Sequence, residues 1–372
     1  MRNLLFCWAI YLTLSMAFSH ASYGVEFPKV KIVTLKSDIR SPWGMTQLPD
    51  NTWLITEKAG TILTIDSDNQ SSYIGDLPVD LYTAGQGGML DILLHPDFTQ
   101  NQWVYISYSA GSAEANQLVV ARAKLKDNQL SAWETIFRVL PFKDTPVHYA
   151  GRMLFLADNS LLISSGDGFD YREDAQKLTS LLGKVIRISD LGMALDDNPF
   201  YIGDGGAHDF IFTLGHRNQQ GLVYDPSQGL VILHEHGPAG GDEINFLKAG
   251  ENYGWPVVTD GKDYSGANIS PFSDYPGMRL PEYNWTPSIA PSAMSYYNAS
   301  LFPSLAGDLL ITALKTRRLY WAQLEQGKVT SVQPVVSQLK QRLREVDVGN
   351  DGAIYVLTDG ENASLLKIIP AK

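Results

Sequence analysis

Four glycine-rich segments of the sequence carry side chains that could do chemistry, at 85–88 (GQGG), 148–152 (HYAGR), 215–221 (GHRNQQG) and 235–245 (EHGPAGGDEIN). Each lies between two apolar runs of the kind that form strands. His148 could act as a general base, and Gln86 offers an amide donor and acceptor. Glycine beside them lets the backbone approach a ligand closely. Such loops on a strand scaffold predict a site for a polar cofactor or substrate.

Several cationic side chains stand where they could bind an anion. Arg217, next to Asn218, suits bidentate recognition of a carboxylate. Arg342 and Arg344 are two positions apart on an expected strand, so both guanidinium groups point to the same side. Lys315 follows the apolar run 309–314. Structural alternatives are an internal salt bridge for Arg217, a solvated face for Arg342 and Arg344, backbone bonding for His148, and a tight turn for Gln86.

The sequence contains one segment that suits a metal ion and lacks several common catalytic and nucleotide-binding motifs. The segment 235–256 combines acidic residues, glycines and accessible carbonyl groups, which suits calcium, although its spacing is not that of an EF-hand. No HExxH motif is present, which disfavours a zinc centre. No P-loop, no Gly-x-Ser-x-Gly elbow and no dinucleotide fingerprint follow an expected strand, so ATP, nicotinamide and serine-hydrolase chemistry are all disfavoured.

The chain begins with a predicted signal peptide at 1–21. A basic start is followed by an apolar stretch at 4–18 and by the small-x-small sequence Ser19-His20-Ala21. A membrane anchor is the alternative, and the stretch is short for one. Removal of this segment would also remove Cys7, the one cysteine of the chain. We therefore expect a periplasmic or secreted protein at 22–372 without disulfides and without membrane insertion.

The net charge is −11 for 372 residues, which makes nucleic acid and anionic lipid poor partners. Short apolar runs dominate, and a turn with Asp or Asn precedes a strand-like run six times, at 48–51, 95–97, 157–159, 225–226, 307–308 and 350–352. Six such units predict a single all-β domain, a six-bladed β-propeller. A pair of β-sandwiches or a barrel is the alternative. Long insertions between the third and fifth turns are expected to carry GHRNQQG and GGDEIN, and a short helix is expected at 174–182.

The motifs occur together in a fixed order, among them SPWGM, GQGGMLDILLHPDF, VHYAGRM, LTSLLGKVIRI, GHRNQQGL, EHGPAGGDEINFLKAGENYGWP and RLREVDVGNDGAIYVLTD. In this the chain resembles the glucose/sorbosone dehydrogenase family, and within it the soluble enzymes that oxidise aldose sugars with pyrroloquinoline quinone (PQQ). The resemblance extends from about Ser41 to Ile368. It implies a six-bladed propeller with its cofactor on the loops at one face.

The resemblance also implies roles for individual residues. His148 is expected to take the proton of the sugar C1 hydroxyl while hydride passes from C1 to carbon C5 of PQQ. Gln86 is expected beside cofactor and substrate, and Arg217 with Asn218 at the quinone oxygens. The further expected contacts are Ala313, Leu314, Lys315, Arg342 and Arg344 at the PQQ carboxylates, Tyr264 at the cofactor rim, the carbonyl groups of Gly237 and Pro238 at a calcium that touches PQQ, and Glu243 and Tyr253 at a calcium in the same region.

One departure bears on the substrate. Val147 precedes His148 where the glucose-oxidising branch has an acidic residue, so broad aldose oxidation is expected rather than a preference for glucose. The expected partners are an aldose sugar and an external electron acceptor, and the protein is expected to be a monomer or homodimer. Two other functions stay open from the sequence: a propeller that binds a glycan or a protein without catalysis, and a calcium-dependent lactonase.

Overall fold

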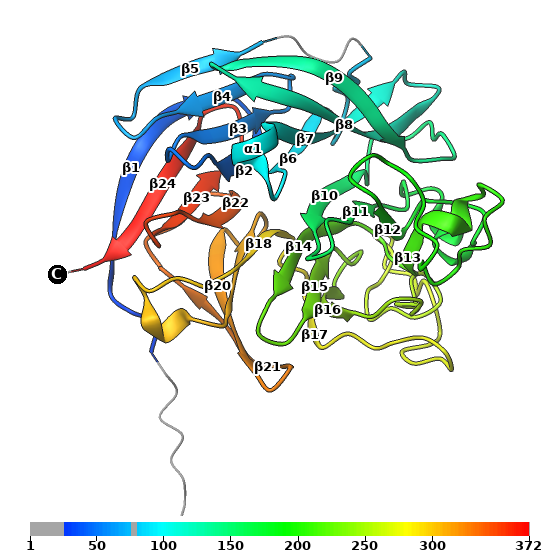
Figure 1. Ribbon diagram of the computed structural model, residues 1–372. Helices are drawn as coiled ribbons and strands as arrows, with labels where there is room; N and C mark the ends of the chain where they lie inside the picture. Colours follow the sequence, from blue (N-terminus) through cyan, green and yellow to red (C-terminus); the bar gives the residue numbers. More distant parts are fainter. Residues whose placement is uncertain (1–25, 76–79, 372) are drawn as a thin grey trace, which may run out of the picture.

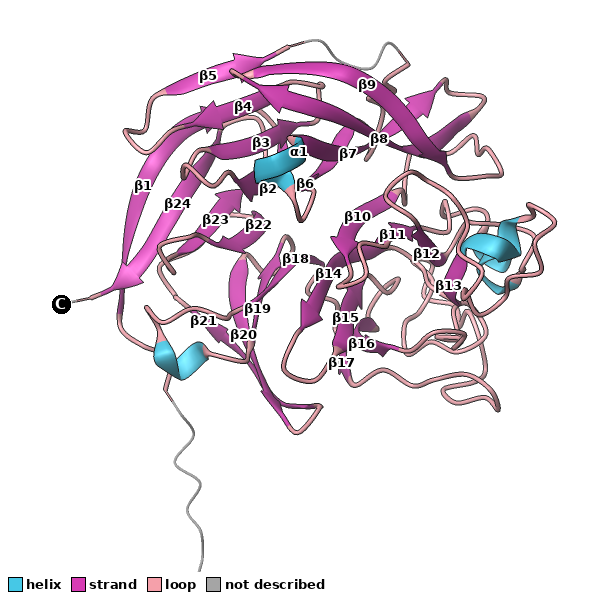
Figure 2. Ribbon diagram, in the orientation of Figure 1, coloured by secondary structure: helices cyan, strands magenta, loops and turns pink. Residues whose placement is uncertain are grey.

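The computed structural model describes residues 26–75 and 80–371, so the predicted signal peptide lies outside the described residues. All 24 described strands belong to six four-stranded antiparallel sheets arranged around a centre (Figure 1). This confirms the predicted six-bladed β-propeller, and the alternatives of a sandwich pair or a barrel are wrong. Figure 2 shows how little helix accompanies the strands.

Five sheets follow chain order from the centre outward: β2 (Pro42–Gln47), β3 (Trp53–Glu57), β4 (Ile62–Ile65) and β5 (Ser71–Ile74); β6 (Met89–Leu94), β7 (Trp103–Gly111), β8 (Asn116–Lys126) and β9 (Gln129–Arg138); β10 (Ala150–Phe155), β11 (Leu161–Ser165), β12 (Lys184–Ile188) and β13 (Ile211–Leu214); β14 (Gln219–Asp225), β15 (Leu230–Glu235), β16 (Asp242–Leu247) and β17 (Tyr283–Trp285); β18 (Pro291–Tyr296), β19 (Leu309–Ala313), β20 (Arg318–Glu325) and β21 (Lys328–Val335).

The sixth sheet joins the two ends of the chain. It consists of β22 (Leu343–Val348), β23 (Ile354–Thr358), β24 (Ala363–Pro370) and, at its outer edge, β1 (Val30–Ile39). β1 and β24 pair antiparallel from Val30 opposite Pro370 to Ile39 opposite Ala363, and they lie side by side in Figure 1. Because the first described strand completes the last blade, backbone hydrogen bonds close the ring of blades.

The six Asp/Asn turns occupy equivalent positions, since each joins the first strand of a blade to the second. Asn51 and Asn159 adopt left-handed φ angles of 72° and 63°, a conformation that asparagine tolerates. Strand direction alternates along a blade, so these turns lie at one face of the propeller. The connections between the second and third strands, and those between blades, lie at the opposite face. We call this opposite face, away from the six turns, the loop face. All four glycine-rich segments lie on it.

Two expectations about the connections need correction. The long insertions are 189–210, between β12 and β13, and 248–282, between β16 and β17, whereas GHRNQQG joins two blades and GGDEIN joins β15 to β16. The expected helix at 174–182 is only a 3-10 turn, Arg172–Gln176. Lys184 explains the difference, because its ammonium group donates to the carbonyl oxygens of Asp174, Ala175 and Leu182 (2.7, 3.0 and 2.8 Å). These carbonyl groups are therefore held in a loop conformation.

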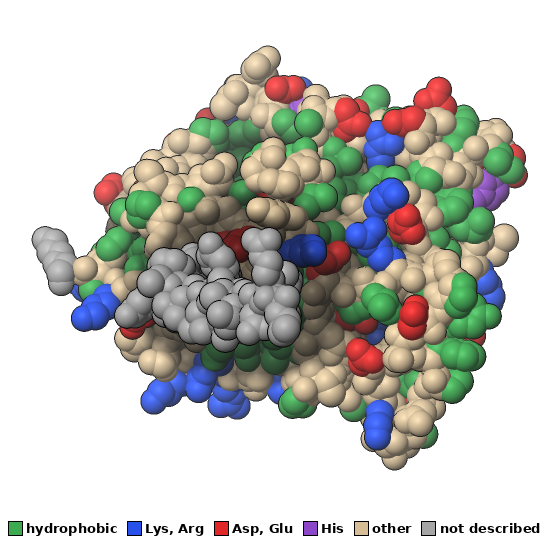
Figure 3. All heavy atoms as spheres, turned by 90° about the horizontal axis from the view of Figure 1, so that it is seen from below, with side chains coloured by type: hydrophobic (Ala, Val, Ile, Leu, Met, Phe, Trp, Pro, Cys, Tyr) green, Lys and Arg blue, Asp and Glu red, His purple; other side chains and the backbone are tan. Residues whose placement is uncertain are grey.

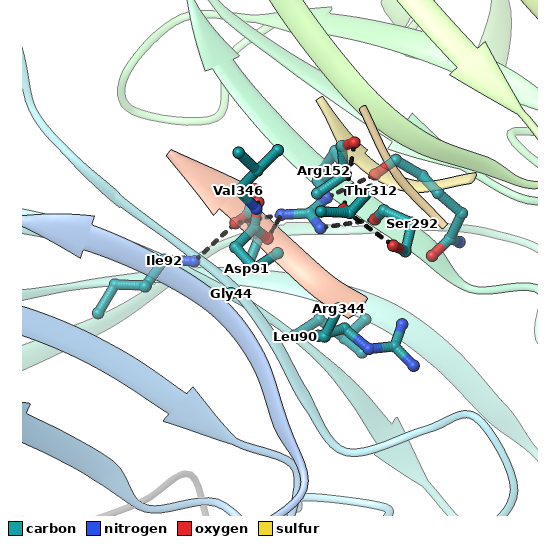
Figure 4. Close-up of polar contacts among 12 residues, drawn as sticks. Gly44, Leu90, Asp91, Ile92, Arg152, Ser292, Thr312, Arg344 and Val346 are labelled. Atoms are coloured by element: carbon teal, nitrogen blue, oxygen red, sulfur yellow. Dashed lines mark hydrogen bonds and ion pairs between the residues drawn. The ribbon is translucent and has the colours of Figure 1, made fainter. Parts of the chain in front are cut away.

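A single buried guanidinium group connects all six blades, and Figure 4 shows it beside Asp91 and Ser292. Its contacts, one from each of the other blades, are the Trp43 ring (4.2 Å), Asp91 (3.4 Å), the carbonyl oxygens of Gln220 and Ser292 (2.7 and 3.0 Å) and Glu345 (2.5 Å). The residue is Arg152, on β10. Burial raises the pKa of Glu345 to about 8, although Arg152 acts to lower it. One cation thus holds two buried carboxyl groups within the ring.

Where the side drawn in Figure 3 is not covered by grey atoms, acidic, basic and apolar side chains are interspersed. Within residues 26–75 and 80–371, no helix has the length and apolar character needed to cross a membrane. The core lies between the blades, in apolar clusters such as the one that contains Tyr297, Trp321 and Leu343.

Candidate active site

A cavity opens at the loop face, near the propeller axis. Counting the solvent in its mouth, it has about 620 Å³ of empty space. It is lined by Trp43, Lys58, Gly85, Gln86, Leu90, Tyr149, Ala150, Asn218, Gln220, His236, Leu314, Arg342 and Arg344. These residues come from every blade, so the cavity exists only in the closed ring.

One wall of this cavity is cationic. Arg342 and Arg344 both bind Asp359, with Nε–O distances of 2.8 and 2.9 Å, which confirms that their side chains point to the same side. Burial acts to raise the pKa of Asp359, but the two arginines outweigh it and hold this pKa below its usual range. Lys58 adds a third positive charge and donates to the Gly85 carbonyl oxygen (2.9 Å). Three cations facing one carboxylate leave positive charge for a bound anion.

His148 directly precedes Tyr149 and Ala150, which line the cavity, and is itself buried. Its backbone N–H donates to Gln86 Oε1 (2.9 Å), and its φ angle is 52°, in the left-handed region. A side chain at Gly166 would place its Cβ 2.2 Å from the His148 carbonyl oxygen, so glycine is required there. Hydrogen bonding and close packing therefore fix the imidazole on a rigid turn.

Asp167 sets the state of this imidazole, and the sequence analysis missed it. Its Oδ1 lies 2.7 Å from His148 Nδ1, and its Oδ2 accepts the indole N–H of Trp255 (2.8 Å). A carboxylate at Nδ1 keeps the proton on that nitrogen and leaves Nε2 free to accept one. Burial lowers the pKa of His148, with Arg217 contributing, although Asp167 acts to raise it. The only sequence signal was an Asp-Gly pair directly after a strand.

Arg217 is a buried cation whose charge acts on both members of this pair. Its Nη1 donates to the carbonyl oxygens of His236 and Gly237 (3.1 and 2.8 Å), and Nη2 lies 3.4 Å from the hydroxyl of Tyr264. No carboxylate among the described residues forms an ion pair with it. The predicted alternative of a structural salt bridge therefore finds no support. A buried guanidinium group without an anionic partner favours an anionic ligand or a developing negative charge.

A second cavity has Arg217 in its wall. It is lined by Phe169, Asp170, Arg172, Glu173, Arg217, Pro238, Trp255, Asp263, Tyr264 and Ile269. The long connection 248–282 reaches it because Tyr253 donates its backbone N–H to Leu214, at the end of β13 (2.8 Å). Trp255 and Tyr264 come from this connection. His148 contacts both sides, through Gln86 toward the first cavity and through the Phe169 ring (5.2 Å) toward the second.

The structure brings most of the predicted cofactor contacts together. Gln86, Asn218, Leu314, Arg342 and Arg344 line the first cavity, and Arg217, Pro238 and Tyr264 line the second. Ala313 is buried in the core behind Leu314, whereas Lys315 is exposed and lines neither cavity. Its role at the cofactor stays a prediction. Lys58 and His236 were missed; burial lowers the pKa of His236 to about 3, so its ring is a neutral part of the wall.

The predicted calcium ligands form two separate environments. The Gly237 carbonyl oxygen already accepts a hydrogen bond from Arg217, so a calcium ion there would share this oxygen with a guanidinium group. Glu243 fits a cation better. Burial and the neighbouring Glu235 raise its pKa well above the ordinary value, and the Oδ1 of Asn245 beside it is buried without a hydrogen-bond partner. A divalent ion at Glu243 would relieve both features.

The predicted ligand Tyr253 lies near this acidic group. Its ring stacks on His216 (4.9 Å), which binds Glu235 (2.8 Å). Its phenol oxygen donates to the Phe246 carbonyl and accepts from the Lys248 backbone N–H (2.7 and 2.9 Å). The side chain is thus fully engaged, which leaves the backbone carbonyl group as the atom available to a metal.

Comparison with known proteins places this geometry in context. A family model described as "Glucose / Sorbosone dehydrogenase" matches residues 39–367. The chain is 37% identical over 348 residues to "Aldose sugar dehydrogenase YliI" of Escherichia coli (strain K12), a match that covers 92% of this chain and 93% of that protein.

Two solved structures share the fold over nearly their full length. The apo form of the soluble aldose sugar dehydrogenase from Escherichia coli is 36% identical with a TM-score of 0.88, and the match covers 92% of this chain and 100% of that one. The PQQ-bound form of an aldose sugar dehydrogenase from Streptomyces coelicolor is 26% identical with a TM-score of 0.73 and the same coverage.

Proposed function

The chain belongs to the glucose/sorbosone dehydrogenase family, and on that premise we propose that it oxidises aldose sugars at C1 to lactones with PQQ as its cofactor. One observation carries the proposal. A buried imidazole with a carboxylate at Nδ1 adjoins a cavity whose cations exceed its carboxylates. The first group suits removal of a hydroxyl proton, and the second suits a polyanionic cofactor. A lactonase would instead need carboxylates that converge on a metal, and the cavity wall is cationic.

The chemistry of the cavity fits PQQ, which carries three carboxylates. Lys58, Arg342 and Arg344 would hold these groups, because Asp359 offsets only part of their positive charge. Arg217 and Asn218 would contact the quinone oxygens, where a buried guanidinium group stabilises negative charge more than it would in water. When bound, PQQ supplies the two-electron acceptor for the hydride that leaves C1.

The chain itself manages the proton. The C1 hydroxyl group gives its proton to Nε2 of His148, and the C1–O bond becomes the carbonyl bond of the lactone as hydride leaves C1. Asp167 then faces the imidazolium that forms and stabilises its charge. Burial keeps the imidazole neutral beforehand, which is the state that a base requires. Gln86 fixes the turn that carries this ring.

Further parts of the proposal rest on sequence features. We propose that calcium is required, with Glu243 and Tyr253 at one ion and Gly237 and Pro238 at the cofactor. Val147 offers no charge to a sugar hydroxyl, which supports a broad choice of aldoses. Electrons then pass to an external acceptor. The predicted signal peptide at 1–21 supports export to the periplasm or beyond, and the N-terminal sequence of the exported protein is expected to begin at residue 22.

The test is reconstitution of the purified chain 22–372 with PQQ and Ca²⁺. Reduction of an artificial electron-accepting dye is followed with D-glucose, D-galactose, D-xylose and maltose. We expect turnover with several sugars, and quinone absorbance that stays with the protein after desalting. A matched Glu243→Gln sample should need more Ca²⁺ for the same activity. If no sugar is oxidised and no quinone is retained, the proposal is wrong.

A further inference from the structure

Two exposed aromatic rings stand at the mouth of the second cavity, and the proton chemistry makes no use of them. Phe169 is 43% exposed and Tyr264 is 65% exposed, although both are large apolar side chains. Their ring centroids lie 6.3 Å apart with an angle of 19° between the planes. Both line the second cavity. We call Phe169 and Tyr264 the aromatic rim.

The backbone at Phe169 is held in an unfavourable conformation. Its φ angle is 70°, in the left-handed region, which bulky side chains rarely adopt. The Oδ1 of Asp167 accepts the Phe169 backbone N–H (2.8 Å), and the same oxygen binds His148 Nδ1 (2.7 Å). One carboxylate oxygen therefore sets both the imidazole and the aromatic ring beside it. Strain of this kind persists where the surrounding structure requires it, often at functional sites.

Resting on the proposed function, we infer that the aromatic rim binds the pyranose ring of the aldose through one of its C–H faces, and so sets substrate affinity. C–H groups of a sugar carry partial positive charge and contact the negative face of an aromatic ring favourably. The edge-on contact of the Phe169 ring with the His148 ring (5.2 Å, 78°) places such a face next to the base. A sugar held there would bring C1 toward His148.

Charge around the rim specifies the class of sugar. Asp170 and Glu173 line the cavity and are exposed, and Asp263 beside them is half-buried, whereas the cation Arg217 is buried. Arg172, which also lines this cavity, forms an ion pair with Glu173 (Nε–Oε1 distance 3.1 Å). Neutral sugars can donate hydroxyl hydrogen bonds to these carboxylates, while a sugar acid meets repulsion. The inferred substrates are therefore neutral aldoses, and D-glucuronate should bind less well than D-glucose.

The experiment compares ring-removing with ring-retaining substitutions. Phe169→Leu and Tyr264→Leu remove the aromatic faces, whereas Phe169→Tyr and Tyr264→Phe keep them. Tyr73→Leu, at an exposed tyrosine on β5 outside both cavities, is the matched control. For each variant, KM and kcat for D-glucose are measured with PQQ bound. Binding of D-glucose to the PQQ-free protein is measured by saturation-transfer NMR.

We expect KM and the dissociation constant of D-glucose to rise about 3- to 10-fold in the leucine variants. Both values should rise less in Phe169→Tyr and Tyr264→Phe, and only Tyr73→Leu should behave as the wild type. Unaltered sugar affinity in both leucine variants would overturn the inference. Tyr264→Leu keeps the test decisive if Phe169→Leu folds poorly, because Tyr264 is a largely exposed loop side chain. Equal KM values for D-glucose and D-glucuronate would overturn the part that concerns charge.

The proposed function and the role of the aromatic rim can be contradicted separately. If wild-type protein with PQQ oxidises no aldose, the proposed function is wrong, and the NMR titration still decides whether the rim binds sugar. If wild-type protein is active and the leucine variants bind sugar normally, the proposed function stands and the aromatic rim is wrong.

Discussion

Asp167 binds His148 through one carboxylate oxygen and Trp255 through the other, at 2.7 and 2.8 Å. The three residues come from three different connections. Asp167 follows β11, His148 precedes β10, and Trp255 lies between β16 and β17. Because both oxygens are engaged, the carboxylate cannot rotate, and the Nδ1–H tautomer of His148 is specified. The imidazole is therefore oriented before any substrate arrives.

Replacing Asp167 by Asn should disable the base while leaving the cavities intact. The amide can donate to Nδ1 and so place the imidazole proton on Nε2, which then cannot accept a proton from the sugar. We expect kcat to fall by about 10²- to 10⁴-fold, with PQQ retention near that of the wild type. Trp255→Phe is the control that removes only the second hydrogen bond, and it should cost far less. Equal losses in the two variants would contradict this role.

The activity should persist below the usual titration range of histidine. Burial, with help from Arg217, lowers the pKa of His148 below 6.5, while Asp167 opposes the shift without reversing it. A base is active when neutral, so a lowered pKa moves the acid limb of kcat/KM to lower pH. We expect the half-maximal point of the acid limb of kcat/KM to lie below pH 6.5. A half-maximal point at or above pH 6.5 would count against His148 as the base.

Catalysis and cofactor binding should separate by mutation. His148→Gln keeps a polar side chain but lacks a base, so we expect normal PQQ titration with a loss of about 10²–10⁴-fold in turnover. Arg342→Ala removes a cation from the wall of the first cavity, so we expect weaker PQQ retention and recovery of turnover at saturating PQQ. The measurement is a PQQ titration of each apoprotein followed by dye reduction. Identical titration curves for the two variants would contradict this division of roles.

Stability should depend strongly on Arg152, because it contacts all the other blades from the centre (Figure 4). Arg152→Met would leave Asp91 and Glu345 buried without their cation. We expect the free energy of unfolding to fall by about 3–5 kcal/mol, as measured by urea denaturation. Arg152→Lys keeps the positive charge but lacks the planar guanidinium group. Its free energy of unfolding should therefore fall less than that of Arg152→Met. A methionine variant as stable as the wild type would show that the carboxyl groups are held by other means.

The propeller could be predicted because its repeat is local. Each turn of the type seen at Asn51 and Asn159 depends on a few neighbouring residues, and each is followed by an apolar run that forms the second strand of a blade. The same locality made His148, Arg217, Arg342 and Arg344 recognisable, since each is a chemically distinctive residue at the end of a strand. The helix expected at 174–182 was wrong because the structure there depends on a residue outside that segment. The ammonium group of Lys184 binds carbonyl oxygens that a helix would use.

The sequence by itself therefore determined the blade number, the strands and the residue types available at the loop face. Only the closed ring decided which of those residues meet: Asp167 with His148, Asp359 with the two arginines, and Lys58 in the cavity wall, while Lys315 stayed outside it. Contacts between residues many positions apart depend on how the blades pack around the axis. The spacing of residues along the sequence does not predict that packing.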